Sequence, residues 1–318
     1  MFATVKPQLS AFALDVAEGL SLKQKRIAPH HFYDDLGSSL FEAITLLPEY
    51  GLARADERLL RRHAPDIAAE TGPISIVAEL GSGTGKKTKH VLDALLYPSP
   101  GLTYRPIDVS QTALEMCQEV LGKWCSVEAI RSDWLQGLAE VDRTRFDAGR
   151  LLVLFLGSSI GNLERTCISE FLRNVRFHLR DGDFFLLGAD LVKDIQVMLS
   201  AYDDSTGVTA AFNLNLLGRI NRELDADFDL RSFAHEVRWG ESERRIEMHL
   251  LSLRNQSARS RALEATFDFQ IGETIWTESS HKFTKDELAD YARSSGFETM
   301  ATWTDAEWPF VETLWRAA

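Results

Sequence analysis

The sequence lacks the features by which several classes of protein are recognised. Its three cysteines, Cys117, Cys125 and Cys167, form no CxxC pair and are odd in number, which argues against a disulfide framework and a cysteine metal site. No apolar run approaches the roughly 18 residues of a membrane span. The N-terminus has neither the basic opening nor the apolar core of a signal peptide. We therefore expect a cytoplasmic protein with no membrane partner.

Positive charge is also scarce. The chain has 35 Lys and Arg residues against 47 Asp and Glu residues, a formal net charge of -12. This balance opposes the neutralisation of phosphates on which nucleic-acid affinity depends. The histidines are scattered without the spacing of metal ligands, so we expect no metal. We expect a monomer that acts on a small molecule and has no nucleic-acid partner.

Apolar residues are plentiful, at 45% of the 318 residues, and from residue 75 onward they follow a regular alternation. Short apolar runs typical of buried strands alternate with helical patterns. The predicted strands are 75–80, 102–109, 127–134, 150–157 and 183–191, and the predicted helices are 86–96, 111–124 and 164–179. This order predicts an α/β fold with a mostly parallel sheet, whose ligands lie beyond the carboxyl ends of the strands.

The alternation stops after Leu191. Two helical patterns, 193–204 and 208–224, are followed by strand-like segments at 233–239, 245–254, 262–271 and 274–283. A helix then begins after Thr284, which has Glu287 three residues on as in a capping box, and two strand-like segments end the chain. We predict a core formed by residues 55–192 and 283–318, and a second domain formed by residues 1–54 and 193–282.

The turn AELGSGTGKKTK, residues 78–89, follows the first predicted strand. A phosphate-binding P-loop requires a second glycine five positions after Gly81, where Lys86 stands. The dinucleotide fingerprint starting from Gly81 and Gly83 requires a third glycine at the same position. Both interpretations fail on spacing.

The remaining interpretation is the glycine turn of S-adenosylmethionine-dependent methyltransferases, formed here by Gly81, Ser82, Gly83 and Thr84. It needs an acid at the end of the second strand for the ribose hydroxyls, and Asp108 is placed for this role. It also needs an acid and an aromatic residue beside the adenine, and Asp133 and Trp134 stand at the end of the third strand. A tight turn with two helix N-caps would explain each residue separately, but it would not explain why they occur together.

Longer segments make the similarity more specific. FYDDLGSSLFEAITLLPEY, FLGSSIGN, AYDDSTGVTAAFNLNLL and TESSHKF, among others, resemble the Nα-methyltransferases of ergothioneine biosynthesis, which trimethylate L-histidine to hercynine. The resemblance spans nearly the whole chain. It implies a Rossmann-like, S-adenosylmethionine-dependent methyltransferase core with an inserted α+β substrate-binding domain. Gly85, where the family often has serine, and Gly51, where a second aromatic is expected, depart from its pattern.

The resemblance also implies roles for individual residues. Those expected to hold the α-amino and α-carboxylate groups, and so to act in catalysis, are Tyr33, Asn162 and Tyr202. Those expected to wall the pocket or face the histidine side chain are Phe41, Tyr50, Gly157, Met248, Glu278 and Ser280. Lys87 would contact the carboxylate of the cofactor. A carboxylate and a hydroxyl can read both nitrogens of an imidazole, which suits Glu278 and Ser280.

Other interpretations stay open at this stage. Tyr33 and Phe41 are spaced eight residues apart and could belong to one buried helical face. Met248 could be a core residue of a strand, and Glu278 could be an exposed strand residue. The substrate could be another amino acid, such as a tryptophan derivative, although Glu278 argues against it. The chain could also be a S-adenosylmethionine-binding module that has lost catalysis.

Overall fold

The structure, a computed structural model, describes residues 9–97, 99, 101–145 and 149–318. Residues 1–8, where a signal peptide was not expected, lie outside the described residues, as does that part of the predicted segment 1–54. The chain forms two compact units. The first unit comprises residues up to Ile44, 199–240 and 246–279, and the second comprises residues 45–198, 241–245 and 280–318.

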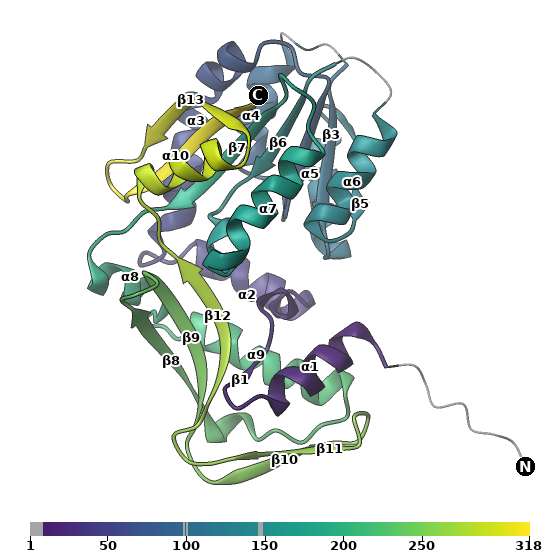
Figure 1. Cartoon of the computed structure of the whole chain (residues 1–318). Coiled ribbons are helices and arrows are strands. Elements are labelled where there is room, and N and C mark those ends of the chain that lie inside the picture. The colour runs from purple at the N-terminus through teal and green to yellow at the C-terminus, as the bar shows by residue number, and fades with distance from the viewer. Residues whose placement is uncertain (1–8, 98, 100, 146–148) are drawn as a thin grey trace, which may run out of the picture. The chain divides into compact units, whose positions relative to one another are not determined.

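The second unit contains an eight-stranded sheet in the order β13-β14-β7-β6-β2-β3-β4, with the short β5 also paired to β3 (Figure 1). The strands from β7 to β4 are parallel, and β13 and β14 are antiparallel additions at one side. The strands are β2 (Ile76–Leu80), β3 (Thr103–Asp108), β4 (Ser126–Val127), β5 (Ile130–Arg131), β6 (Leu151–Phe155), β7 (Phe184–Asp190), β13 (Phe297–Thr304) and β14 (Phe310–Ala317).

Helices cover both faces of this sheet, which is why its central strands are buried throughout and mostly apolar. Every residue of β2, β6 and β7 is buried. Alternate residues of one strand enter separate cores: Ala78 packs with α6, α7 and α10, and Val77 packs with α3, α4 and α5. The helices are α3 (Gly51–Thr71), α4 (Thr88–Leu96), α5 (Gln111–Leu121), α6 (Trp134–Thr144), η2 (Ser159–Asn162), α7 (Arg165–Phe177) and α10 (Lys285–Ser294).

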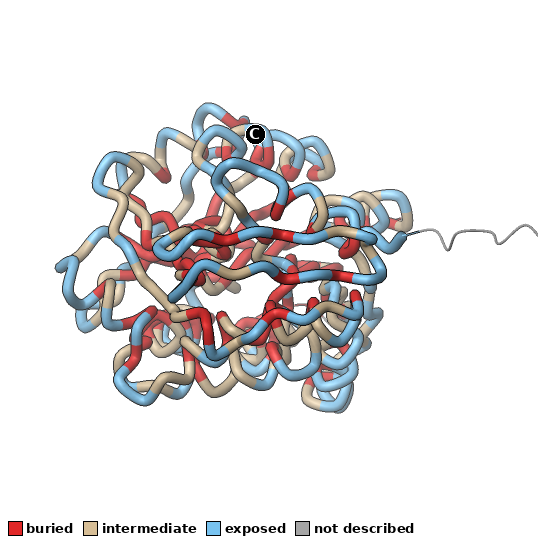
Figure 2. Tube along the Cα trace, turned by 90° about the horizontal axis from the view of Figure 1, so that it is seen from below, coloured by how far each residue is buried: buried red, intermediate tan, exposed pale blue. Residues whose placement is uncertain are grey.

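Local sequence explains where these helices begin and which face they bury. Helix α7 buries Ile168, Phe171, Leu172 and Val175, the spacing of one helical face. Each such side chain contributes roughly 1.5–3 kcal/mol on burial. Helix α10 begins at the predicted capping box of Thr284. Figure 2 shows buried residues mostly toward the inside of the trace and exposed residues on its outer turns.

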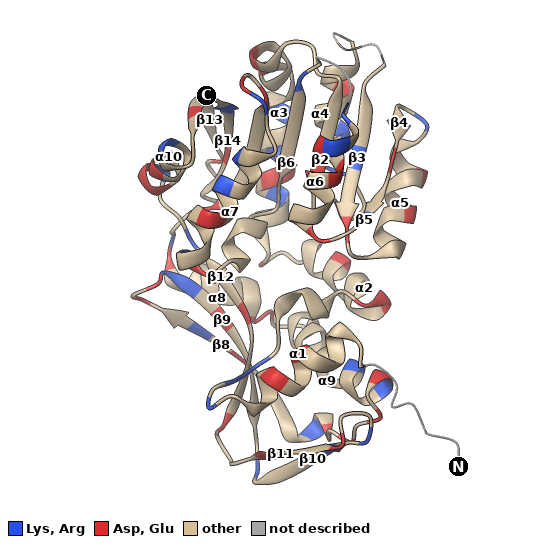
Figure 3. Ribbon diagram, turned by 45° about the vertical axis from the view of Figure 1, so that its right-hand side comes forward, with Lys and Arg blue, Asp and Glu red and all other residues tan. Residues whose placement is uncertain are grey.

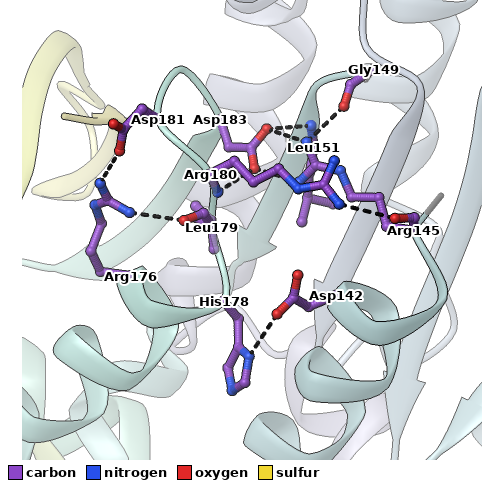
Figure 4. A network of polar contacts seen from close by, with 10 residues as sticks. All are labelled: Asp142, Arg145, Gly149, Leu151, Arg176, His178, Leu179, Arg180, Asp181 and Asp183. Carbon is purple, nitrogen blue, oxygen red and sulfur yellow. Dashed lines mark hydrogen bonds and ion pairs between the residues drawn. The ribbon is translucent and has the colours of Figure 1, made fainter. Parts of the chain in front are cut away.

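The amino edge of the sheet is fastened by a buried ion pair (Figure 4). The Arg145 guanidinium donates to both carboxylate oxygens of Asp183, at 2.5 and 2.8 Å, and both side chains are 2% exposed. Asp183 also accepts from the backbone N–H groups of Leu151 and Arg180. This network joins the end of α6 to the starts of β6 and β7.

The first unit has a four-stranded sheet in the order β1-β12-β9-β8 and a β10-β11 hairpin. Helix α9 packs on β8, and its inward side chains include Phe212, Leu216 and Ile220. The elements assigned wholly or mainly here are α1 (Ala11–Ser21), β1 (Lys25–Arg26), η1 (Pro29–Phe32), α2 (Asp35–Thr45), α9 (Val208–Glu223), η3 (Leu230–Ser232), β8 (Phe233–Gly240), β9 (Arg245–Ser252), β10 (Gln256–Ser260), β11 (Ala265–Phe269) and β12 (Thr274–His281), together with the second half of α8 (Ile195–Tyr202).

The predicted α/β class and most predicted elements are confirmed, but the predicted strand 127–134 is wrong. It consists of the short strands β4 and β5, after which Asp133 caps α6 by accepting from the Gln136 N–H at 2.9 Å. The pattern was misread because an N-cap aspartate follows directly on an extended segment. None of the helices in the described residues is long and apolar enough to cross a membrane.

Candidate functional site

The glycine turn of residues 81–85 connects β2 to the start of α4. Gly81, Gly83 and Gly85 have φ values of 72°, 52° and 68°, a region that favours glycine. The Gly81 N–H donates to the Ile107 carbonyl at 2.8 Å, which holds the turn against the end of β3. A Cβ on Gly83 would meet nothing within 4 Å, so the turn is open beside this residue. Thr84 is half-buried in the same turn.

Asp108, the last residue of β3, is bound to this turn. One of its oxygens accepts from the Gly83 N–H at 3.0 Å, and the other accepts from the Ser110 N–H at 2.9 Å. Burial raises the pKa of Asp108, and the hydrogen bonds from the backbone oppose that shift. The structure therefore brings together the predicted ribose-binding acid and the predicted glycine turn.

Trp134 lies beside the same turn from the start of α6. Its Nε1 would be 3.1 Å from a Cβ on Gly81, and its ring makes an edge contact with Phe155 at a centroid distance of 4.8 Å. Asp133 is exposed and caps the helix. The predicted pair thus reaches the carboxyl edge of the sheet from a helix start rather than from a strand end.

Lys87 precedes α4 and is joined to a second turn through Asp56 of α3. Asp56 Oδ2 lies 2.5 Å from Lys87 Nζ and accepts from the Gly157 N–H at 2.9 Å. Asp56 is completely buried, whereas the Lys87 side chain is 31% exposed. The predicted cofactor residue Lys87 and the predicted substrate residue Gly157 therefore share one carboxylate oxygen.

The turn after β6 is conformationally strained. Gly157 has φ 72°, and Ser158 has φ 60°, an unusual value for a residue with a side chain. The Ser158 hydroxyl accepts from the Asp190 N–H at 2.9 Å, which stabilises this turn against the end of β7. Asn162 follows as the last residue of η2.

Ser280 belongs to a buried charged cluster at the end of β7. Lys282 Nζ donates to Ser280 Oγ at 2.9 Å and lies 2.9 Å from an oxygen of Asp190. Lys193 and Trp308 also donate to Asp190, at 2.5 and 2.9 Å. Burial is the main cause that lowers the pKa of Lys193 to about 8. Ser280 thus accepts a hydrogen bond from a completely buried lysine.

The remaining predicted residue of the second unit is Tyr50. It is 8% exposed and occupies the N-cap position of α3, ahead of Asp56 in the same helix. The next residue, Gly51, has no room for the aromatic side chain that the family pattern suggested. A Cβ there would lie 2.1 Å from the ring of Trp308, which explains the departure.

The first unit holds the other predicted substrate residues. The rings of Tyr33 and Phe41 meet edge to face at 5.6 Å, and both contact Phe212. Tyr33 is 37% exposed, so it is not part of a buried helical face. Tyr202 is buried, and its carbonyl lies 2.8 Å from His235 Nε2.

Met248 and Glu278 lie on the neighbouring strands β9 and β12. The Thr277 hydroxyl donates to the Met248 carbonyl at 3.0 Å, and the Glu278 carbonyl accepts from Trp276 Nε1 at 2.9 Å. Met248 is 2% exposed, as a core residue would be. Glu278 and Ser280 are two residues apart on β12, so their side chains lie on the same face of that strand.

Three buried carboxyl groups near the glycine turn were not identified from the sequence: Asp56, Glu79 and Glu312. Glu79 accepts from the Thr88 and Tyr104 hydroxyls, and burial is the main cause that raises its pKa to about 7. The sequence pattern around each of these three residues could have indicated its burial. Asp56 falls on the apolar face of α3, and the two glutamates interrupt apolar strands.

Within the part of the chain that the structure describes, one group of side chains has a composition that could bind a metal: Asp15, His30 and His31. His31 Nε2 lies 3.0 Å from Asp15 Oδ2, and burial lowers the pKa of His31 to about 4. The Arg219 guanidinium donates to the His31 carbonyl at 2.8 Å and brings a positive charge to the group. We interpret this group as a structural hydrogen-bond cluster.

The comparisons with known proteins agree with one another. A family model described as histidine-specific, SAM-dependent methyltransferase matches residues 12–317. The histidine N-alpha-methyltransferase of Mycolicibacterium smegmatis is 40% identical over 93% of this chain and 91% of that protein. Ergothioneine biosynthesis protein 1 of Neurospora crassa is 27% identical over 86% of this chain and 31% of that protein.

The fold has a solved counterpart. The crystal structure of a Thermobifida fusca protein described as a candidate methyltransferase has a TM-score of 0.50, with 13% identity, over 94% of this chain and 97% of that chain. This likeness supports the Rossmann-like methyltransferase fold. With the family match over nearly its whole length, the chain belongs to the histidine-specific methyltransferases that use S-adenosylmethionine as methyl donor.

Proposed function

We propose that this chain transfers methyl groups from S-adenosylmethionine to the α-amino nitrogen of L-histidine, up to the trimethylated betaine hercynine of the ergothioneine pathway. The match of a histidine-specific family model to residues 12–317 is the observation that carries the proposal. Glu278 and Ser280, side by side on one face of β12, supply the acid and hydroxyl that could read an imidazole.

The residues around the glycine turn fit the cofactor. Gly83 leaves open space, and the buried Ser82 hydroxyl has no hydrogen-bond partner among the described residues. We assign the ribose to Asp108, the adenine to Asp133 and Trp134, and the carboxylate of the cofactor to Lys87. The turn itself contributes Gly81, Ser82, Gly83 and Thr84. When bound, the cofactor supplies a methyl group on a positively charged sulfur, which is a good leaving group.

The protein's main task in this reaction is to align a neutral amine. An α-amine has an ordinary pKa of about 8, so part of it is already neutral near pH 7, and no strong general base is needed. We assign Tyr33, Asn162 and Tyr202 to hydrogen bonds that orient the nitrogen lone pair. Positioning of this kind is a large source of rate in displacement reactions.

The side-chain pocket would discriminate by hydrogen bonds. We assign its walls to Phe41, Tyr50, Gly157 and Met248, and its polar contacts to Glu278 and Ser280. Because Lys282 donates to Ser280 Oγ, the Ser280 hydroxyl hydrogen is itself a donor, which suits an unprotonated ring nitrogen. An amino acid without ring nitrogens would leave these polar groups unpaired, and that loss disfavours it.

We also propose that residues 1–54 and 193–282 form the substrate-binding domain, and that 55–192 and 283–318 form the cofactor-binding core. The compact units have similar though not identical boundaries. We expect a cytoplasmic monomer with a free amino acid as its substrate.

The test is a methyl-transfer assay with purified protein, S-adenosylmethionine and a panel of free amino acids, including tryptophan and its derivatives. Mass spectrometry should show gains of one, two and three methyl groups on histidine. Faster transfer to another amino acid would overturn the substrate assignment. No transfer to any of them, with the cofactor still bound, would identify the chain as an inactive binding module.

A further inference from the structure

Two buried carboxyl groups lie near Lys87 where α3 packs on β14, one from each of these elements. Asp56 of α3 is completely buried and Glu312 of β14 is 1% exposed. Glu312 lies over Gly188 of β7, because a Cβ there would be 2.6 Å from Glu312 Oε1. The two carboxyl groups lie close enough to share a hydrogen bond.

Such a bond requires a proton on one of the two groups. If both were ionised, Asp56 Oδ1 and both Glu312 oxygens would be buried acceptors with no donor among the described residues. Two carboxylates in contact inside a protein cannot both keep their charge, so one proton resolves both problems. Asp56 already accepts from Lys87 and Gly157, which identifies Glu312 as the group that donates.

The charges facing Glu312 come from three elements. They are Asp56 on α3, Lys87 before α4 and Glu79 on β2. Burial raises the pKa of Glu312 well above its ordinary value, and Asp56 and Glu79 add to this shift while Lys87 opposes it. With Glu312 neutral, the Asp56 and Lys87 charges cancel.

We propose that Asp56 and Glu312 are positioning residues for methyl transfer. Asp56 fixes the Lys87 ammonium on the cofactor side and the Gly157 turn on the amino-acid side through a single oxygen. Glu312 fixes Asp56 by donating the proton that the two carboxyl groups share. This inference rests on the proposed function, which assigns Lys87 to the cofactor and Gly157 to the amino acid.

The arrangement has two consequences for binding. Because one oxygen holds both turns, occupation of the cofactor side should strengthen binding of the amino acid. Ionisation of Glu312 would place a second negative charge beside Lys87 and weaken its attraction for the cofactor carboxylate. Cofactor affinity should therefore be constant at lower pH and should fall as the pH rises through the raised pKa of Glu312.

Isothermal titration calorimetry of the full chain measures its affinity for S-adenosylhomocysteine from pH 6 to 9. The same method measures its affinity for histidine in the presence and in the absence of S-adenosylhomocysteine. Glu312→Gln keeps a donor for Asp56 but cannot ionise, so its affinity should stay within about twofold of the unchanged protein near pH 6 and lose the alkaline decline. Glu312→Leu, which cannot donate, should weaken binding about tenfold or more. Titration of Glu79 and of the ligand affects the unchanged protein, Glu312→Gln and Glu312→Leu alike. Differences in affinity among these three proteins therefore report on Glu312.

Asp56→Asn should weaken binding of S-adenosylhomocysteine about tenfold and abolish its effect on histidine affinity. Asp305→Asn is the matched control, because Asp305 also pairs with α3, through Arg58 at 2.6 and 2.9 Å, but contacts neither turn. Asp305→Asn should lower the thermal stability of the protein, but S-adenosylhomocysteine should still change the affinity for histidine as it does in the unchanged protein.

An equal alkaline decline in the unchanged protein and in Glu312→Gln would overturn the proposal. So would an equal loss of affinity in Glu312→Gln and Glu312→Leu, since the role assigned to Glu312 is donation. These measurements with S-adenosylhomocysteine need no methyl transfer. Failure of the histidine assay would therefore be distinguishable from failure of this inference.

Discussion

Asp108 and Glu278 are assigned to different ligands, so removing each should affect different affinities. Asp108→Ala should weaken S-adenosylhomocysteine binding about tenfold or more, because the ribose and the backbone N–H groups of Gly83 and Ser110 lose their acceptor. Glu278→Ala should weaken histidine binding by a similar factor and leave the cofactor affinity unchanged. Calorimetry with each ligand measures both effects. Equal losses of both affinities in both variants would contradict the site assignment.

Glu79 should make stability depend on pH. Its pKa is 4.5 ordinarily and about 7 in the folded chain, so between these values the folded state carries a proton that the unfolded state lacks. The free energy of unfolding should therefore fall as the pH rises through this window, by up to roughly 3 kcal/mol.

Glu79→Gln should remove this slope, because an amide can accept from Tyr104 and Thr88 without ionising. Denaturant unfolding at several pH values measures it, and Glu140→Gln, at an exposed position of α6, serves as the control. A slope that persists in Glu79→Gln and equals that of the control would show that Glu79 is ionised in the folded chain.

Strong local patterns decided which secondary-structure elements could be predicted. The mostly apolar runs of β2, β6 and β7 predicted the parallel sheet, and the strand ends then located Asp108 and Gly157. The short strands β4 and β5 gave no such signal, and the pattern predicts a strand at Asp133 although this residue caps α6. Asp56 and Glu312 meet only after α3 packs on β14, a contact between distant segments that periodicity cannot reveal.

The ion pair between Arg145 and Asp183 should affect stability without affecting binding. Arg145→Met would leave Asp183 charged and buried, which costs about 3–5 kcal/mol. Cofactor affinity should not change, because Asp183 bonds to the first residue of β6, at the amino edge of the sheet, whereas the glycine turn follows the carboxyl end of the parallel strand β2. Denaturant unfolding and calorimetry measure the two effects.

Arg105→Met is the matched control, because Arg105 pairs with the half-exposed carboxylate of Glu128 in the same unit. Its cost should stay near 1 kcal/mol or below. A comparable cost for the two variants would mean that burial does not govern the strength of the Arg145 pair.

At the scale of the whole molecule, charge should govern the choice of partner. Acidic and basic residues are interspersed along the ribbon, and the acidic ones are in excess (Figure 3). We expect no saturable binding to duplex DNA or to transfer RNA at about 0.15 M salt, because few phosphates could be neutralised. Fluorescence anisotropy with labelled nucleic acids tests this expectation. Saturable binding that weakens with added salt would reveal a basic surface and contradict it.

The pairing of β14 with β7 also constrains how the chain can fold. Residues 310–316 of one strand pair with residues 184–190 of the other, and a bridge between Leu191 and Phe283 closes the intervening segment at its base. Closing a loop of this length costs chain entropy before the contacts repay it, so such pairings form slowly. If residues 199–279 become compact first, the flexible loop that must close between β7 and β14 is effectively shorter. Completion of the cofactor-binding sheet should therefore be a late folding event that depends on order in the inserted segment.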